Sequence, residues 1–172
     1  MCNMVCEQCT LSPATIAVQG CYRTDWSQGS LKPPIHVTST FIAETAQALA
    51  DEFVRLYGLD GQGPRPSVEQ VYTRAGNPSF QIFEDRIRHL EGAEGATLLG
   101  SGMAAIVTTL LALTRHGDTI LFGSPVYGGT DFLLREIMPD LGRKVVDFVA
   151  TEPSQVAIDL IHEHSPKVVF IE

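Results

Sequence analysis

From Ala96 onward the chain alternates short apolar runs with segments of helical periodicity. The apolar runs are rich in β-branched and aromatic residues, and they cover 96–99, 119–122, 144–149 and 167–171. Helices are expected between them, from the turn at 100–103 to about residue 115, at 129–138 and at 154–162. Near-continuous apolar strands that alternate with helices are typical of a parallel sheet covered on both faces. The sequence therefore predicts an α/β fold.

A glycine-rich turn, Gly100-Ser101-Gly102-Met103, connects the first of these strands to an apolar helix. The first turn of a helix leaves backbone N–H groups unpaired at the positive end of its dipole, where a phosphate can bind. Gly100 and Gly102 carry no Cβ, so an anion can come close to the backbone there. By itself, the turn is equally consistent with a connection that binds nothing.

Charge and hydropathy exclude several classes of protein. The 172 residues are enough for one sizeable core, and the net charge of −8 argues against a nucleic acid or an anionic membrane as partner. The longest apolar stretch, Met103 to Leu113, is too short to span a bilayer. Because the N-terminus lacks the basic and apolar regions of a secretory signal, we expect a reducing, cytoplasmic setting.

The cysteines and histidines do not predict a metal site. Cys2, Cys6 and Cys9 have the spacing of the radical-SAM iron–sulfur loop, but that loop follows a barrel strand and this one starts at the second residue. We interpret residues 1–12 as a poorly ordered tail. No H-E-x-x-H or comparable pattern occurs among the histidines, which are His36, His89, His116, His162 and His164.

The first part of the chain is less regular. We expect a helix at 13–18 ended by Gly20, a loop at 25–34, an extended segment at 35–41 and a helix at 43–56. Asn77 suits a helix N-cap and Pro78 the first helical position, which predicts a helix to Leu90. Glycines and prolines mark a linker at 57–66, and we place a boundary there between an N-terminal arm, 1–60, and a larger domain, 61–172.

Three groups of residues suit an anionic, flat ligand. Backbone N–H groups at Ser101–Met103 form the first. In the second, the Arg74 guanidinium can hold two phosphate oxygens and Tyr72 can add a phenolic hydrogen bond. In the third, Tyr127 follows the next strand on the carboxyl side of the sheet, where it can stack on a ring. Each of these side chains, taken alone, is equally an ordinary surface residue.

Several motifs in order give a specific resemblance. Tyr72 to Ser79, YTRAGNPS, resembles the Y-[ST]-R-x-x-N-P-[ST] motif of the Cys/Met-metabolism PLP-dependent enzymes. That family includes cystathionine γ-synthases, cystathionine lyases, methionine γ-lyases and O-acetylhomoserine sulfhydrylases. The resemblance runs from about residue 14 to the last residue and includes Pro33-Pro34-Ile35, Thr38-Ser39-Thr40-Phe41, Leu90-Glu91-Gly92, Ser101 to Ile106, Arg115 to Asp118, and Tyr127 to Thr130.

The resemblance implies a fold and an activity. The chain would be an N-terminal arm and the first part of a mainly parallel PLP-binding domain, the large domain of aspartate-aminotransferase-like enzymes. The complete enzyme would use pyridoxal 5'-phosphate to catalyse β- or γ-elimination or γ-replacement on amino acids of transsulfuration, as a carbon–sulfur lyase or synthase. It would be a cytoplasmic homotetramer built from dimers.

The same resemblance implies roles for the matching residues. Ser101, Gly102 and Met103 would bind the cofactor phosphate, and Tyr127 would stack on the pyridine ring in the catalytic centre. Tyr72 and Arg74 would reach the phosphate held by a neighbouring subunit. Glu172 would lie at the edge of the substrate site.

The chain also departs from the family pattern. The aspartate that pairs with the pyridine nitrogen and the S-x-[ST]-K lysine would both lie beyond Glu172. The lysines present, Lys32, Lys144 and Lys167, have no such context. We therefore expect a fragment that is inactive alone. Gly129 stands where methionine γ-lyases carry a cysteine, which argues against that subclass.

Two alternatives remain open from the sequence. Gly100 to Ala105 also fits the G-x-G-x-x-[GA] form of an NAD(P)-binding Rossmann oxidoreductase. That fold needs an acidic residue at the end of the next strand, whereas Asp118 precedes it. The second alternative is a non-catalytic assembly module, which an exposed edge strand would favour.

Overall fold

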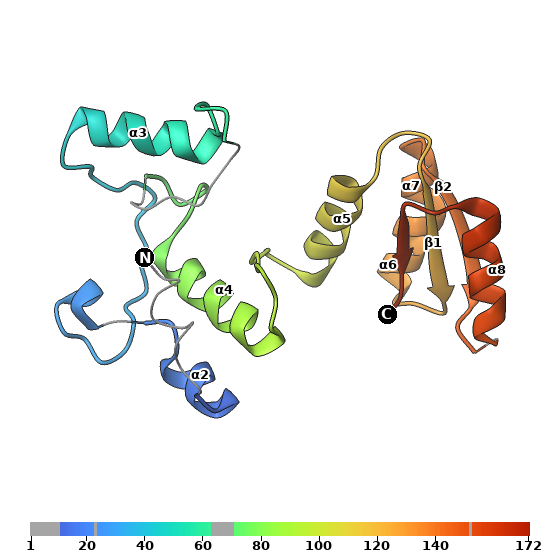
Figure 1. Cartoon of the computed structure of the whole chain (residues 1–172), viewed down its shortest axis with the longest axis horizontal. Coiled ribbons are helices and arrows are strands. Elements are labelled where there is room, and N and C mark those ends of the chain that lie inside the picture. The colour runs from blue at the N-terminus through green and yellow to red at the C-terminus, as the bar shows by residue number, and fades with distance from the viewer. Residues whose placement is uncertain (1–10, 23, 63–70, 152) are drawn as a thin grey trace. The chain divides into compact units, whose positions relative to one another are not determined.

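Two compact units make up the structure, a computed structural model that describes residues 11–22, 24–62, 71–151 and 153–172. One unit ends at Leu98, and the other runs from Leu99 to Glu172 (Figure 1). The second unit contains all three strands, and the first is built from helices and extended segments.

The second unit is built on a parallel sheet. Its strands are β1 (Thr119–Ser124), β2 (Lys144–Val149) and β3 (Val168–Phe170), in the order β2-β1-β3. All of β1 pairs with β2, and three residues in its middle pair with β3. The predicted α/β class and these three strands are confirmed. The strand predicted at 96–99 is wrong: the described sheet offers it no ladder, and the Leu98 N–H donates instead to the Glu84 carboxylate at 2.7 Å.

Helices connect the strands by crossovers on opposite faces. The stretch from β1 to β2 contains α6 (Gly128–Phe132), the wider π-type turn η2 (Leu133–Ile137) and α7 (Met138–Asp140), which follow one another without a break. The stretch from β2 to β3 contains α8 (Ser154–His164). The chain passes from β1 to β2 on one side, and then crosses β1 to reach β3 on the other side. Because right-handed crossovers in opposite directions use opposite faces, the two helical stretches lie on opposite sides of the sheet (Figure 1).

One face of this sheet holds the apolar core. Side chains alternate along a strand, so Ile120 and Phe122 point to the same side. They cluster with Leu110 of α5 (Gly102–Leu113) and with Leu133, Leu134 and Met138. These six side chains are buried, and the core packs α5 and the helical turns that follow α6 against the sheet.

In its described residues, the first unit contains α2 (Pro13–Gln19), the 3-10 turn η1 (Thr24–Ser27), α3 (Ala46–Tyr57) and α4 (Pro78–Glu91). The three α-helices agree with the predicted ones to within about one turn. The expected loop at 25–34 begins with η1. The segment predicted to be extended, 35–41, forms a single antiparallel bridge, between Thr40 and Tyr72.

Polar side chains join distant segments of the first unit. The Arg86 guanidinium on α4 donates to the carbonyl oxygens of Gly20, Ala17 and Val18 at the end of α2, at 2.8–3.3 Å. The Asn77 amide donates to the His36 carbonyl at 3.1 Å. Segments on both sides of residue 60 are therefore in one compact unit, which ends at Leu98. The division into an arm, 1–60, and a larger domain, 61–172, stays a prediction.

Several sequence expectations concern residues outside this description. Cys2, Cys6 and Cys9 lie outside the described residues, so their interpretation as a tail stays a prediction.

Cys21 is buried and disulfide-bonded, which the expectation of a reducing setting did not anticipate. In the described ranges, no helix is long and apolar enough to cross a bilayer, and no three potential metal ligands come together.

Candidate functional site

The N-terminus of α5 is capped by Ser101. Ser101 has extended backbone angles, φ −164° and ψ 163°, and its Oγ accepts the N–H of Ala104 at 3.1 Å. Its carbonyl accepts the N–H of Ala105 at 3.0 Å. Within the described part of the chain, the N–H groups of Gly102 and Met103 have no hydrogen-bond partner, as expected for the first two positions of a helix.

The space around the two glycines of this turn is open. A Cβ placed on Gly102 or on Gly100 would meet no atom within 4 Å. The first turn of α5 carries no acidic residue that would repel an anion. An exposed helix start of this kind favours a phosphate or a carboxylate.

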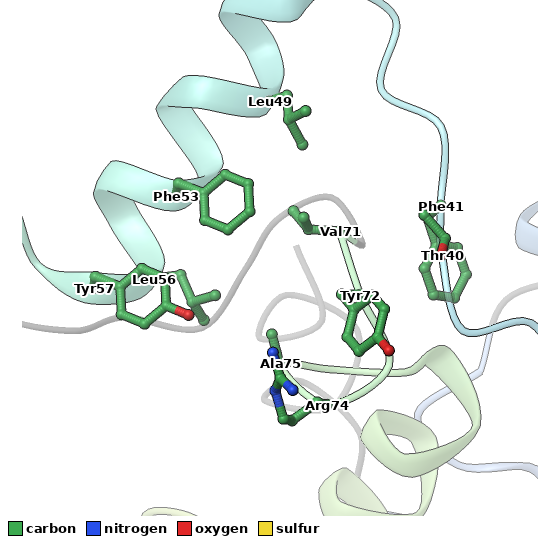
Figure 2. A pocket seen from close by; sticks show the side chains of 10 residues that line it. All are labelled: Thr40, Phe41, Leu49, Phe53, Leu56, Tyr57, Val71, Tyr72, Arg74 and Ala75. Atoms are coloured by element: carbon green, nitrogen blue, oxygen red, sulfur yellow. The ribbon is translucent and has the colours of Figure 1, made fainter.

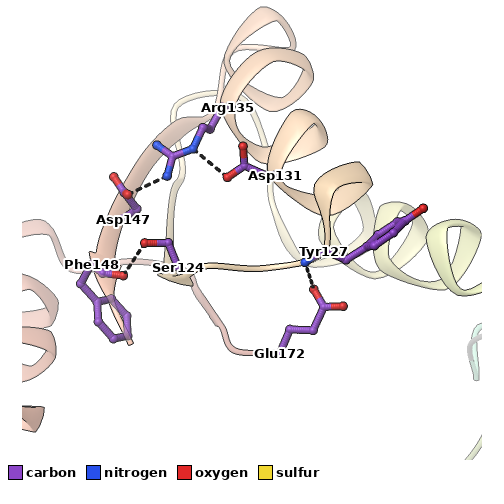
Figure 3. A network of polar contacts seen from close by, with 7 residues as sticks. All are labelled: Ser124, Tyr127, Asp131, Arg135, Asp147, Phe148 and Glu172. Carbon is purple, nitrogen blue, oxygen red and sulfur yellow. Dashed lines mark hydrogen bonds and ion pairs between the residues drawn. The ribbon is translucent and has the colours of Figure 1, made fainter. Parts of the chain in front are cut away.

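The carboxyl ends of the three strands are tied together by side chains (Figure 3). At the end of β1, the Ser124 hydroxyl donates to the Phe148 carbonyl of β2 at 3.1 Å. The Tyr127 N–H, just beyond β1, donates to the Glu172 carboxylate, just beyond β3, at 3.2 Å. Tyr127 and Glu172 therefore lie together at the edge of the sheet where parallel α/β folds bind ligands.

The Tyr127 side chain lies at the junction of α5 and α6. Its ring is next to Gly129, points away from Glu172, and leaves the residue 64% exposed (Figure 3). The Met103 sulfur lies 3.3 Å from the position that a Cβ on Gly129 would take, and it accepts the Thr130 hydroxyl at 3.9 Å. Met103, the second residue of α5, therefore lies beside the start of α6. The roles of Ser101–Met103 and of Tyr127 stay predictions.

An ion-pair network that the sequence did not predict links α6 to β2 through Arg135. The Arg135 guanidinium contacts Asp147 of β2 at 2.7 Å and Asp131 of α6 at 2.8 Å, and it lies 5.0 Å from the centre of the buried Phe122 ring. The hydrogen bonds that Arg135 donates, first to Asp147 and then to Asp131, raise the pKa of Arg135 above its ordinary value. The spacing of Asp131 and Arg135 is the usual i, i+4 pair, but nothing local points to Asp147.

Tyr72 and Arg74 belong to the first unit, whereas Ser101–Met103 belong to the second. The Arg74 guanidinium is 5.2 Å from the centre of the Tyr72 ring, a cation–π contact. Both side chains line a hollow of about 560 Å³ whose other walls are mainly apolar (Figure 2), formed by Thr40, Phe41, Leu49, Phe53, Leu56, Tyr57, Val71 and Ala75. Their expected action on the phosphate of a neighbouring subunit stays a prediction.

Lys144 and Lys167 do not lie beside Tyr127 and Glu172. Lys144 is the first residue of β2, and the Lys167 N–H bonds to the carbonyl of Thr119, the first residue of β1. Both therefore mark the amino edge of the sheet, opposite the edge that carries Tyr127. Lys32 belongs to the first unit.

Residues 14–172 match the family model of the Cys/Met metabolism PLP-dependent enzymes. Together with the parallel sheet and the exposed helix start beside Tyr127, this match shows that the chain belongs to that family. It decides against the NAD(P)-binding oxidoreductase considered above.

Named relatives are similar over most of this chain. The O-acetyl-L-homoserine sulfhydrylase of Leptospira meyeri is 34% identical over 133 residues, which are 77% of this chain and 28% of that protein. The L-methionine gamma-lyase of Pseudomonas putida is also 34% identical, over 77% of this chain and 31% of that protein.

A solved structure agrees with the fold. The cystathionine gamma synthase from Xanthomonas oryzae pv. oryzae, in complex with cystathionine, matches with a TM-score of 0.73 and 27% identity. The match covers 94% of this chain and 36% of that one. The chain thus spans about a third of the length of the relatives it matches.

Proposed function

We propose that this chain supplies the phosphate-binding part of a pyridoxal-phosphate site in an enzyme of sulfur amino-acid metabolism. The observation that carries the proposal is the exposed start of α5, where the N–H groups of Gly102 and Met103 have no hydrogen-bond partner in the described part of the chain and a Cβ on Gly102 would meet no atom within 4 Å. Membership of the PLP-dependent family supports it.

The residues present fit the phosphate end of this cofactor. A dianionic phosphate suits two unpaired N–H groups at the positive end of a 12-residue helix. Gly102 has no side chain to keep the phosphate away. Ser101 fixes the helix start by accepting two further N–H groups, so the donors are held in place before the ligand arrives.

Other residues would orient the ring and complete the site. Tyr127 would stack its exposed ring on the pyridine ring, and Glu172 would lie at the edge of the substrate site. Tyr72 and Arg74 would add a hydroxyl and a guanidinium to the phosphate of a second subunit, since the guanidinium can bond two phosphate oxygens at once. This arrangement needs a homo-oligomer, which we propose to be a dimer of dimers.

The cofactor, when bound, supplies an electron-withdrawing ring that stabilises negative charge at the α-carbon of an amino acid. The side-chain group at the β- or γ-carbon would then leave or be replaced. The proposed substrates are sulfur amino acids or activated homoserine, in line with the relatives named a sulfhydrylase, a gamma-lyase and a cystathionine synthase. Because Lys144 and Lys167 mark the opposite edge of the sheet, this polypeptide alone is proposed to bind without turning over.

The test measures binding of pyridoxal phosphate to the full chain by equilibrium dialysis. Gly102→Pro removes one N–H group at a position where a helix tolerates proline, and Ser101 already has the extended angles that a following proline requires. A charge-assisted hydrogen bond is worth about 1.5–3 kcal/mol, so the substitution should weaken binding by roughly tenfold or more.

The matched ligand control is pyridoxal, which lacks the phosphate. Its affinity should be the same for the original chain and for Gly102→Pro. Arg74→Ala should also weaken retention of pyridoxal phosphate. No binding of pyridoxal phosphate by the full chain, or equal affinity in Gly102→Pro, would overturn the proposal.

A further inference from the structure

Two arginine side chains meet at the C-terminal end of α5. Thr114, the C-cap residue of this helix, is fully buried. Its carbonyl oxygen accepts a hydrogen bond from Nη1 of Arg115 and another from Nη2 of Arg143, each at 3.2 Å. Because both nitrogens contact one oxygen atom, the two guanidinium groups lie next to each other, and their positive charges repel.

Further acceptors hold each guanidinium in place. Nε of Arg143 donates to the Thr114 hydroxyl at 3.3 Å, and its Nη1 donates to the Leu141 carbonyl at 2.9 Å. Nη1 of Arg115 also lies 3.2 Å from two carbonyl oxygens in the last turn of α5, the negative end of the helix. In the described part of the chain, Nε and Nη2 of Arg115 have no hydrogen-bond acceptor, so they remain available as donors.

Arg135 provides the contrast within the same unit. Its guanidinium contacts the carboxylates of Asp147 and Asp131 at 2.7 and 2.8 Å. Over the described ranges, neither Arg115 nor Arg143 forms an ion pair with a carboxylate. The charge of Arg135 is therefore balanced by contacting groups, whereas the charges of Arg115 and Arg143 are not.

Other cations lie at the same edge of the sheet. Lys144 begins β2 and Lys167 precedes β3, so both mark the amino edge, where the chain leaves α5 for β1. Asp118 accepts the Arg115 N–H at 2.7 Å and Asp140 ends α7, so these two carboxylates offset part of the charge. The cations still outnumber them, although the chain as a whole has a net charge of −8. Such a local excess of positive charge attracts anions.

The two loops that carry the arginines are joined through their backbones. The Gly117 N–H, after α5, donates to the Gly142 carbonyl, before β2, at 2.7 Å. Gly142 has a φ of +79°, and a Cβ there would overlap the His116 ring, so this close approach requires a glycine. Arg115 and Arg143 are thus held side by side in advance, which reduces the conformational freedom that a ligand must remove.

We propose that Arg115 and Arg143 form a binding site for a small dianionic oxyanion, either free phosphate or the phosphate group of a small molecule. Guanidinium groups bind phosphate oxygens through their planar fork of N–H donors. The anion takes the available donors of Arg115 and relieves the repulsion between the two guanidinium groups. This site is separate from the proposed pyridoxal phosphate site, because the two lie at opposite ends of the 12-residue helix α5, about 18 Å apart.

The test is an NMR titration of the full chain with inorganic phosphate, at an ionic strength held constant with sodium chloride. The Nε–Hε resonance of Arg115 and the Gly142 amide resonance should move and saturate, whereas the Nε–Hε resonance of Arg135 should not. Arg115→Gln and Arg143→Gln each remove one charge but keep a side-chain N–H donor, and each should weaken binding by about tenfold or more.

Arg135→Gln is the matched control, because it removes an arginine that already has carboxylate partners. It should leave phosphate affinity at the Arg115 site unchanged. The absence of a saturable shift at Arg115 in the original chain would overturn the proposal. So would unchanged affinity in both Arg115→Gln and Arg143→Gln, which would leave the two arginines only the role of capping α5.

A further variant separates this site from the proposed function. Gly102→Pro, at the other end of α5, should leave the phosphate-induced shift of Arg115 unchanged, and its loss in that variant would overturn the inference. If the original chain binds no pyridoxal phosphate, the proposed function fails while the titration still decides this site. Glycerol phosphate, titrated in parallel, distinguishes the two sources: tighter binding than inorganic phosphate indicates the phosphate group of a small molecule, and equal or weaker binding indicates free phosphate.

Discussion

The two units of the chain are stabilised in different ways. The second unit has an apolar core in which Ile120, Phe122, Leu134 and Met138 are fully buried. In the described residues of the first unit, the buried apolar side chains are Cys21, Val71 and Ile82. Distant segments of this unit are joined by side chains bonded to backbone carbonyls and by the backbone bridge between Thr40 and Tyr72. Ile42 is fully exposed in this unit, and Val37 is 89% exposed.

This difference indicates which unit can hold a precise geometry by itself. A packed core resists small displacements in every direction, whereas a few hydrogen bonds fix only the segments they join. Apolar side chains that stay exposed usually mark a surface that another protein surface covers. The exposed side chains of the first unit are therefore in line with the proposed action of Tyr72 and Arg74 across a subunit boundary.

The largest effect is expected in the core of the second unit. Phe122→Ala should lower the free energy of unfolding by about 3–5 kcal/mol, since it leaves a cavity under the sheet. Urea denaturation followed by circular dichroism measures this change. Phe132→Ala, at a position that is 60% exposed, is the matched control and should cost about 1 kcal/mol or less. Equal effects would show that the core does not dominate.

A smaller loss is expected at the buried cap of the first unit. The Asn77 side chain accepts the Ser79 N–H and donates to the His36 carbonyl and the Thr73 hydroxyl. Asn77→Ala removes the cap and leaves the half-buried His36 carbonyl without this donor, for a cost of roughly 2–3 kcal/mol. Thr45→Ala removes the exposed cap of α3 and should cost about 1 kcal/mol. Amide exchange in α4 and α3 measures the loss of stability in Asn77→Ala and in Thr45→Ala. If the two variants lose the same stability, the long-range hydrogen bond of Asn77 contributes none.

The link between α2 and α4 should be weaker again. Arg86→Lys keeps the charge but loses the fork that reaches three carbonyls, so we expect a loss of about 1–2 kcal/mol. The change should be local to the end of α2, measured as faster cleavage near Val18 by a protease. Arg55→Lys on α3 serves as the control. If Arg86→Lys and Arg55→Lys both resist the protease as well as the original chain does, the Arg86 guanidinium does not hold α2 in place.

The smallest effect is expected at the surface ion pairs of the second unit. Asp147→Asn removes the main partner of Arg135, both of which are about 40% exposed, and should cost about 1 kcal/mol or less. Raising the salt concentration should shrink the difference further, since exposed charges are screened. Arg135 keeps its charge in both states near neutral pH, so this loss should not change between pH 6 and 8. A salt-independent loss of several kcal/mol would show that the pair acts as part of the core.

Local chemistry predicted most of the fold. Asn77 and Pro78 identified the start of α4, and three of the four predicted strands lie where their apolar runs indicated. The same local rules located the helix start at Ser101, because the cap residue and the glycines are adjacent in the sequence. These features depend on neighbours along the chain, which a sequence displays directly.

Features that depend on distant partners were not accessible in this way. The run at 96–99 looks like a strand, but a strand exists only where another offers its N–H and C=O groups, and the described sheet offers none there. Two hydrogen bonds join residues that are distant in the sequence: Arg135 bonds to Asp147, and Tyr127 bonds to Glu172.

The position of β1 between its two partners has a consequence for the order in which the candidate site forms. Tyr127 and Glu172 are 45 residues apart, and their contact needs β3 to join the free side of β1 after β2 and α8 have been synthesised. Closing so long a loop is slow compared with forming α5 or pairing β1 with β2. On a ribosome, the helix start that suits a phosphate would therefore be present first, and Tyr127 would be anchored last.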